Sequence, residues 1–210
     1  MAQKTAKLIG LAGQSCAGKN IVADFLAEKG YVIIDADKVT HEVLQEESEA
    51  IITHFFSYAE KRGLQLRGTD GLLDRRALSV LLFSEPTLLV EHEAFILPKI
   101  EARIRDLIKT ALTEQPNRPV VLNAPTLHKT SLTPECSFIL YIKAPFFTRL
   151  IRGKRRDSIS FCRLIARFLQ QKDFFAQYLS QNADIVSVVN AHSVQSLRKK
   201  IERVLREKGF

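Results

Sequence analysis

The feature that most constrains this chain is a loop at residues 13–20, GQSCAGKN, which lies between segments of different periodicity. The apolar run Lys7–Ala12 before it predicts a buried strand. The spacing of apolar residues over 21–26 predicts a helix, and Gly30 ends it. A second apolar run, Tyr31–Ile34, completes a strand–helix–strand unit. Such a unit implies parallel strands joined by a right-handed crossover.

The middle of the chain has a helical pattern. Helical spacing covers Lys38–Glu47 and Ala50–Lys61, and after a turn at 68–71 Asp74 is expected to cap a helix over Arg75–Phe83. A long helix should follow from about residue 85 to 112, and we expect Pro98 to kink or divide it. Since no convincing strand interrupts this block, we interpret it as a helical insertion.

Strand patterns return in the last part of the chain, and an amphipathic helix begins at Ser193. Five candidate strands alternating with helices predict an α/β fold, a doubly wound parallel five-stranded sheet. We expect a single domain over 1–210. Its core is residues 1–37, 117–148 and 181–210, its helical insertion about 38–116, and its helical lid about 149–180. The three later strands are predicted at Pro119–Ala124, Ser137–Lys143 and Ile185–Val189.

The positive charge is concentrated beyond residue 142. The chain has a net charge of +8, but residues 143–210 hold 15 basic and 5 acidic residues, whereas 1–142 hold 16 and 18. The densest stretch, 149–167, has seven basic residues and one acidic residue. Nucleic acid and a phosphorylated small molecule are both candidate partners for such a segment. Phe161 and Phe168 within it are spaced like packing residues rather than a base-stacking platform.

The loop matches the G-x-x-x-x-G-K phosphate-binding motif in its proper context, after a strand and before a helix. Small residues let backbone N–H groups surround phosphate oxygens, and the helix N-terminus adds positive potential. Asn20 stands where a hydroxyl residue usually follows the lysine, so its amide oxygen is the candidate Mg²⁺ ligand. The candidate ATP-binding residues of the loop are Gly13, Gln14, Ser15, Cys16, Ala17, Gly18, Lys19 and Asn20.

Two aspartates, Asp35 and Asp37, follow the second strand. If the chain stays extended, both point to one side, at the strand end that borders the ligand crevice of an open α/β sheet. One of the pair could instead cap a helix starting at Lys38. We favour Asp37 for proton transfer or metal binding, and Asp35 for a structural or substrate-binding part.

The order of these motifs resembles the dephospho-CoA kinase family over nearly the whole chain. The pairing of DAD with DG-x-LDR is more specific than the loop, which many kinases share. The motifs that carry the resemblance are the loop, VIIDAD at 32–37, DGLLDRRAL at 70–78, Pro98, VVLNAP at 120–125, Arg152, Arg156-Asp157, and Ala183–Val186.

The resemblance implies ATP-dependent phosphorylation of the ribose 3′-hydroxyl of dephospho-CoA, the last step of coenzyme A synthesis, with ATP and Mg²⁺ bound. It implies catalytic roles for Asp37 as general base, for Lys19 and for the lid residue Arg156. It also implies that Arg152 binds ATP and that Arg75 and Asp35 contact the acceptor. The alternatives are another nucleotide or small-molecule kinase, or a noncatalytic ATP- or RNA-binding protein.

The remaining expectations concern the setting in which the chain works. Three scattered cysteines, Cys16, Cys136 and Cys162, argue against a disulfide framework. No apolar run resembles a signal peptide or a membrane span. We therefore expect a cytoplasmic enzyme without a membrane or nucleic-acid partner, and the sequence leaves its oligomeric state open.

Overall fold

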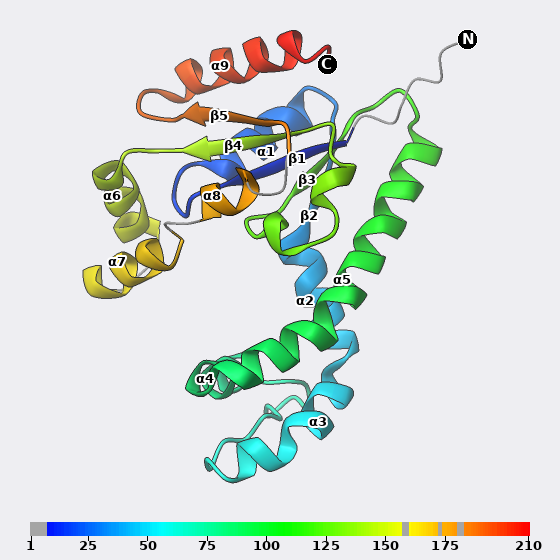
Figure 1. Ribbon diagram of the computed structural model, residues 1–210, viewed down its shortest axis with the longest axis vertical. Coiled ribbons are helices and arrows are strands. Elements are labelled where there is room, and N and C mark those ends of the chain that lie inside the picture. The colour runs from blue at the N-terminus through cyan, green and yellow to red at the C-terminus, as the bar shows by residue number, and fades with distance from the viewer. Residues whose placement is uncertain (1–7, 157–159, 172–173, 180–182) are drawn as a thin grey trace. The chain divides into compact units, whose positions relative to one another are not determined.

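A computed structural model describes residues 8–156, 160–171, 174–179 and 183–210. Its five strands form one parallel sheet in the order β2-β3-β1-β4-β5 (Figure 1). This confirms the predicted α/β class and the strand count. The strands are β1 (Leu8–Gly13), β2 (Val32–Asp35), β3 (Val120–Asn123), β4 (Phe138–Lys143) and β5 (Ile185–Val189).

Strand order puts the phosphate-binding loop at the switch point of the sheet. β1 is central, and the chain leaves it for β2 and β3 on one side and β4 and β5 on the other. Every residue of β1 is buried, as a strand covered on both faces requires. In open α/β sheets, ligands bind outside the carboxyl ends of the strands at such a point.

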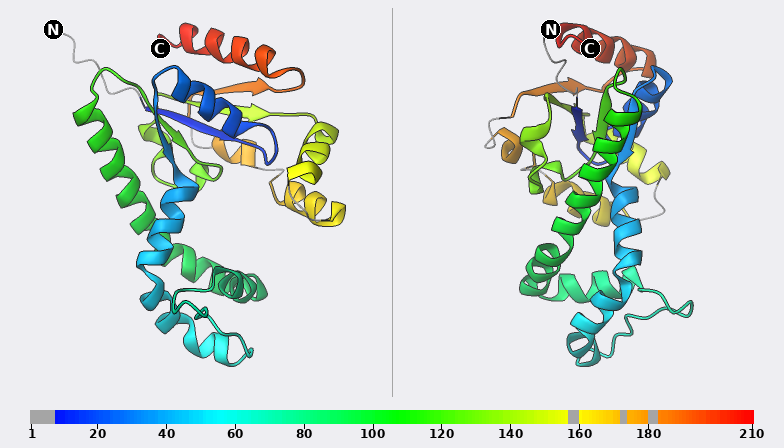
Figure 2. Two further views of the ribbon diagram at one scale, coloured as in Figure 1. Left: turned by 180° about the vertical axis from the view of Figure 1, so that it is seen from behind. Right: turned by 90° about the vertical axis from the view of Figure 1, so that its right-hand side faces the viewer.

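Helices cover both faces of the sheet. On one face, side chains of β1, β3 and β4 pack with α1 (Lys19–Glu28) and α9 (Val194–Glu207) in one apolar cluster. On the other, Tyr141 of β4 contacts Phe175 and Tyr178 of α8 (Phe174–Leu179). The right-hand view of Figure 2 shows α1 and α8 on opposite sides of the sheet. Leu140 packs in the cluster with α1 and α9, whereas Tyr141 packs against α8, because successive side chains of a strand point to opposite faces of the sheet.

The chain divides into two compact units, a sheet unit (Met1–Asp35 with Leu107–Phe210) and a helical unit (Ala36–Asp106). In the helical unit, ion pairs from Lys99 to Glu47 (2.8 Å) and from Arg103 to Glu46 (2.6 Å) tie the long helix to the end of α2. The helices here are α2 (Ala36–Glu46), α3 (Ser48–Glu60), α4 (Arg75–Ser84) and the first part of α5 (Pro86–Glu114).

Two predictions about the helical unit have definite outcomes. Asp74 caps α4 as expected, since its carboxylate accepts hydrogen bonds from the N–H groups of Arg76 (2.8 Å) and Ala77 (3.0 Å). Pro98 does not divide the long helix, because α5 runs through it without a break. Buried Ile96, Ile100 and Ile104 keep the helical pattern continuous on both sides of the proline. Their burial offsets the hydrogen bond that proline removes.

The basic segment forms two further helices, α6 (Phe146–Arg156) and α7 (Phe161–Gln170). Two short 3₁₀ turns that the sequence did not predict follow β3, η1 (Leu127–Lys129) and η2 (Thr133–Glu135). Across the described ranges, no helix is both long enough and apolar enough to cross a membrane. Lys7 and Asp157, which entered the sequence predictions, lie outside these ranges.

Candidate active site

The phosphate-binding loop needs glycine at both glycine positions of its motif for steric reasons. Gly18 has a φ of 99°, a conformation that residues with a Cβ rarely adopt. A Cβ there would lie 2.5 Å from Nδ2 of Asn190, and one at Gly13 would lie 2.5 Å from the carbonyl oxygen of Ile142. The loop is therefore packed directly against the ends of β4 and β5.

Lys19, the first residue of α1, is held at the carboxyl edge of the sheet. Its ammonium group donates a hydrogen bond to Oδ1 of Asn123, and Nδ2 of Asn123 donates to Oδ2 of Asp35 at 3.2 Å. Asp35 and Asn123 are register partners at the ends of β2 and β3. Asn123 is buried. A cation, an amide and a carboxylate thus form one connected group beside the loop.

Asp37 is not on an extended continuation of β2. The strand ends at Asp35 and α2 begins at Ala36, two residues before the expected start at Lys38, so the assumption of an extended chain was wrong. The exposed Asp37 lies in the first turn of that helix. A carboxylate in a first turn is stabilised by the helix dipole, which favours this early start. Asp35 belongs to the sheet unit, and Asp37 follows it into the helical unit.

Two residues of α6 bind backbone carbonyls of the loop. Nε of Arg149 donates to the carbonyl oxygen of Ser15 at 2.9 Å, and Nη1 of Arg152 donates to that of Ala17 at 3.3 Å. The Arg149 guanidinium lies 4.0 Å from the ring centre of Phe168 and is 5% exposed. Burial lowers its pKa below the usual arginine value.

Asn190, immediately after β5, reaches the loop from the other side. Its Nδ2 donates to the carbonyl oxygen of Ala17 at 2.8 Å, and its Oδ1 accepts from Nη2 of Arg152 at 3.5 Å. The side chain is 3% exposed. Arg152 was predicted from the sequence as a site residue, whereas Arg149, Asn190 and Asn123 were not. For Asn123 and Asn190, the sequence feature that could have identified them as site residues is a polar residue at the end of an apolar strand.

Cys16 has a φ of 61°, in the left-handed region that favours glycine. Its Sγ would lie 3.2 Å from a Cβ built on Gly153 of α6. The adjacent N–H of Ser15 donates to Oε1 of Gln171 at 2.9 Å, another contact that sequence reasoning missed. The loop is thus in contact with the basic segment at several points.

The other lid residue expected at the site, Arg156, is the last residue of α6 and is exposed. It follows Lys154 and Arg155, so three cations occupy a helix C-terminus, where the helix dipole favours positive charge. Asn20 is exposed in the first turn of α1. Among the described residues, no group of three or more His, Cys, Asp or Glu side chains could hold a metal.

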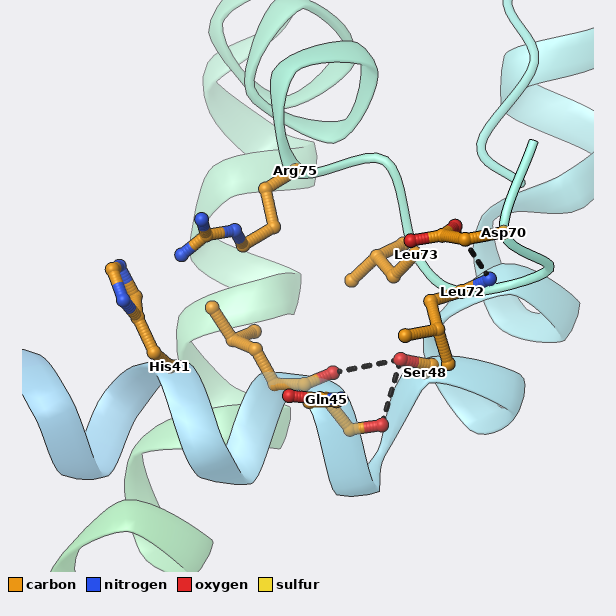
Figure 3. Close-up of a pocket in the computed structure, with 8 residues that line it drawn as sticks. His41, Gln45, Ser48, Asp70, Leu72, Leu73 and Arg75 are labelled. Atoms are coloured by element: carbon orange, nitrogen blue, oxygen red, sulfur yellow. Dashed lines mark hydrogen bonds between the residues drawn. The ribbon is translucent and has the colours of Figure 1, made fainter. Parts of the chain in front are cut away.

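The helical unit has a cavity of about 260 Å³ of its own. Arg75 begins α4 directly after the capping Asp74, and its guanidinium extends toward the same end of the cavity as His41 (Figure 3). At the other end, Ser48 donates to the carbonyl oxygens of Leu44 (3.2 Å) and Gln45 (2.7 Å). The lining residues are His41, Leu44, Gln45, Ser48, Asp70, Leu72, Leu73 and Arg75.

A phosphate-binding loop at the switch point of a parallel sheet, with its lysine hydrogen-bonded to Asn123 at the end of β3, places the chain in the class of P-loop kinases. The family model of dephospho-CoA kinase matches residues 7–204. The chain belongs to the dephospho-CoA kinase family.

Individual relatives agree with the family match over nearly the full length. The dephospho-CoA kinase of Treponema denticola is 48% identical over 203 residues, covering 97% of this chain and 91% of the relative. That of Treponema pallidum is 48% identical over 202 residues, covering 96% and 95%. A crystal structure from Thermus thermophilus has a TM-score of 0.77 at 26% identity and covers 97% of this chain and 98% of its own. The dephospho-CoA kinase of Campylobacter jejuni, at 23% identity and TM-score 0.69, covers 98% and 97% and supports the fold.

Proposed function

We propose that this chain transfers the γ-phosphate of ATP to the ribose 3′-hydroxyl of dephospho-CoA, giving coenzyme A and ADP. The observation that carries the proposal is the connection of Lys19 to Asn123 and Asp35 at the phosphate-binding loop, in a chain 48% identical to two named dephospho-CoA kinases. The loop supplies the ATP site, and the family relationship supplies the acceptor.

The sheet unit binds ATP. Residues 13–20 surround the phosphates with backbone N–H groups, and the Lys19 ammonium, which has three N–H donors, donates to a phosphate oxygen while Asn123 holds it in place. Little covalent chemistry falls to the protein in phosphoryl transfer, so positioning and positive charge carry most of the catalysis. Arg152 contacts ATP, and Arg156 stabilises the transferring phosphoryl group.

Mg²⁺ accompanies ATP in this proposal. The amide oxygen of Asn20 and the carboxylate of Asp35 are hard oxygen donors of the kind that Mg²⁺ prefers, so the donor set at the loop fits the ion. When bound, the ion neutralises negative charge on the phosphates. Asn20 is exposed, so its amide oxygen is accessible to an ion that retains several waters.

Asp37 acts as the general base. Its carboxylate accepts the proton of the ribose 3′-hydroxyl as the 3′-oxygen bonds to the γ-phosphorus and the bond to the β,γ-bridging oxygen breaks. ADP leaves with that bridging oxygen. The exposure of Asp37 in the first turn of α2 leaves its carboxylate accessible to a substrate.

The helical unit receives the acceptor. Dephospho-CoA carries a diphosphate, and Arg75 presents a guanidinium at the cavity that also includes His41 and Gln45. Asp35 contributes a further contact to the acceptor. We place the reaction in the cytoplasm, in keeping with a soluble acceptor and soluble ATP.

A coupled assay of ADP release tests the proposal. The purified chain is given ATP, Mg²⁺ and one acceptor at a time: dephospho-CoA, a set of nucleoside monophosphates, or shikimate. We expect ADP release to depend on dephospho-CoA and to be absent with the others. Release with a nucleoside monophosphate or shikimate instead would assign another kinase activity. No acceptor-dependent release, together with salt-sensitive RNA binding, would favour the noncatalytic alternative.

A further inference from the structure

Side chains from two distant segments hold alternate carbonyls of the phosphate-binding loop. Arg149 of α6 donates to the Ser15 carbonyl at 2.9 Å. Asn190 donates to the Ala17 carbonyl at 2.8 Å, and Arg152 donates to the same oxygen at 3.3 Å. Arg149 and Asn190 are 5% and 3% exposed, so water competes little for these hydrogen bonds.

Holding a carbonyl also fixes the N–H group of the next residue. A trans peptide is planar, and its C=O and N–H point in opposite directions. The described residues include no cis peptide, so the Cys16 and Gly18 N–H groups point away from Arg149 and Asn190.

Those two N–H groups are also available to a ligand. The Ser15 N–H donates to Gln171, and the Ala17 N–H donates to the Gln14 carbonyl at 3.0 Å. Within the described part of the chain, the N–H groups of Cys16 and Gly18 have no hydrogen-bond acceptor. A donor without a partner at a phosphate-binding loop is suited to a phosphate oxygen.

We propose that Asn190 and Arg149 are positioning residues: by holding the Ala17 and Ser15 carbonyls, they aim the Gly18 and Cys16 N–H groups at the phosphates of the nucleotide. The proposal rests on the assignment of ATP to this loop. It adds the residue that follows β5 and a buried α6 arginine to the residues that determine nucleotide affinity.

Asn190 suits this role because its carboxamide is donor and acceptor at once. Nδ2 holds the loop carbonyl while Oδ1 accepts from Arg152. A Cβ at Gly18 would lie only 2.5 Å from Nδ2, so the Asn190 carboxamide packs directly against the backbone of Gly18. Leucine has nearly the shape of asparagine without its donor, and methionine reaches about as far as Nε of Arg149 without an N–H group.

The test measures the binding of ADP and of adenosine by displacement of a fluorescent ADP analogue from the full chain. In Asn190→Leu and Arg149→Met, we expect the dissociation constant of ADP to rise about tenfold or more, because misdirected N–H groups lose hydrogen bonds to a charged phosphate. The affinity for adenosine should not change, because adenosine has no phosphate. A purely structural role would weaken both ligands.

Thr133→Val is the matched control. Thr133 is also buried, and its hydroxyl donates to the carbonyl of Leu127 at 2.9 Å, away from the loop. This variant should lower the melting temperature and leave the affinity for ADP unchanged. If Arg149→Met does not fold, Asn190→Leu decides the question.

Two results would overturn the proposal: wild-type affinity for ADP in Asn190→Leu, or an equal loss of ADP and adenosine affinity. ADP binding involves no acceptor. A wild-type chain that binds ADP but does not phosphorylate dephospho-CoA would contradict the proposed function and leave this inference intact.

Discussion

The ammonium group of Lys19 is hydrogen-bonded to the side-chain oxygen of Asn123, 104 positions further along the chain. The same amide donates to Asp35. Side-chain hydrogen bonds therefore link Lys19, in the loop after β1, to Asn123 at the end of β3 and through it to Asp35 at the end of β2. The lysine of the phosphate-binding loop is therefore held in place by the sheet itself before any nucleotide binds.

Replacing the buried amide should weaken both the fold and the nucleotide site. Asn123→Leu removes the partner of Lys19 and of Asp35 at once, and leaving polar groups unpaired costs about 1–3 kcal/mol. We expect urea denaturation to show a loss of that size in the free energy of unfolding, with a higher KM for ATP. Asn117→Leu, at an exposed position, is the control and should change neither. An Asn123→Leu enzyme with wild-type stability and KM would contradict this reading of the contact.

Removing the carboxylate of Asp37 should affect chemistry rather than nucleotide binding. General-base catalysis contributes about 10²–10⁴-fold, so we expect kcat of Asp37→Asn to fall by that factor with dephospho-CoA as acceptor. The dissociation constant of ADP should stay near the wild-type value. Glu42→Gln, an exposed change in the same helix, should retain full activity. Near-normal turnover in Asp37→Asn would remove this residue from the role.

The cavity of the helical unit offers a test of acceptor binding. Arg75→Met retains much of the side chain and loses the charge, so we expect the KM for dephospho-CoA to rise about tenfold, the equivalent of one hydrogen bond to a charged group. The KM for ATP should not change. Its neighbour Arg76 is exposed and does not line the cavity, so Arg76→Met should leave both constants at wild-type values. An equal effect of the two substitutions would mean that only general charge matters.

The cysteines should differ sharply in reactivity. Burial raises the pKa of the Cys136 thiol to about 12, so at about pH 8 it is almost wholly protonated, and its reactive thiolate accumulates only as the pH approaches that value. Cys162 is exposed. After brief treatment with iodoacetamide, mass spectrometry should find Cys162 modified and Cys136 modified only in denaturant. Equally fast modification of both thiols in the native protein would contradict the raised pKa of the half-buried Cys136 thiol.

Local sequence patterns predicted much of this fold. The strand–loop–helix context identified residues 13–20 as a phosphate-binding loop, and the structure places that loop at the switch point of the sheet. The cap at Asp74 could also be predicted, since it depends on residues within one turn of each other. These features depend on short-range geometry, which a single sequence records directly.

Contacts between distant segments could not be predicted in the same way. Arg149 was one of seven basic residues in a dense stretch, and nothing in its sequence context indicated that its guanidinium would lie buried against Phe168 and the Ser15 carbonyl. Asn190 donates a hydrogen bond to the carbonyl oxygen of Ala17, which lies 173 positions earlier in the sequence. The start of α2 at Ala36 was missed because an apolar strand followed by Asp-Ala-Asp fits either an extended end or a helix first turn.

Dephospho-CoA kinase activity is tested most sharply by identifying the reaction product rather than by measuring a rate. The chain is incubated with ATP, Mg²⁺ and dephospho-CoA, and the product is located by ³¹P nuclear magnetic resonance and mass spectrometry. We expect one added phosphate per acceptor, on the ribose 3′-hydroxyl, formed in equal amount with ADP. Release of ADP without that product, or a phosphate on any other hydroxyl, would contradict the proposed function.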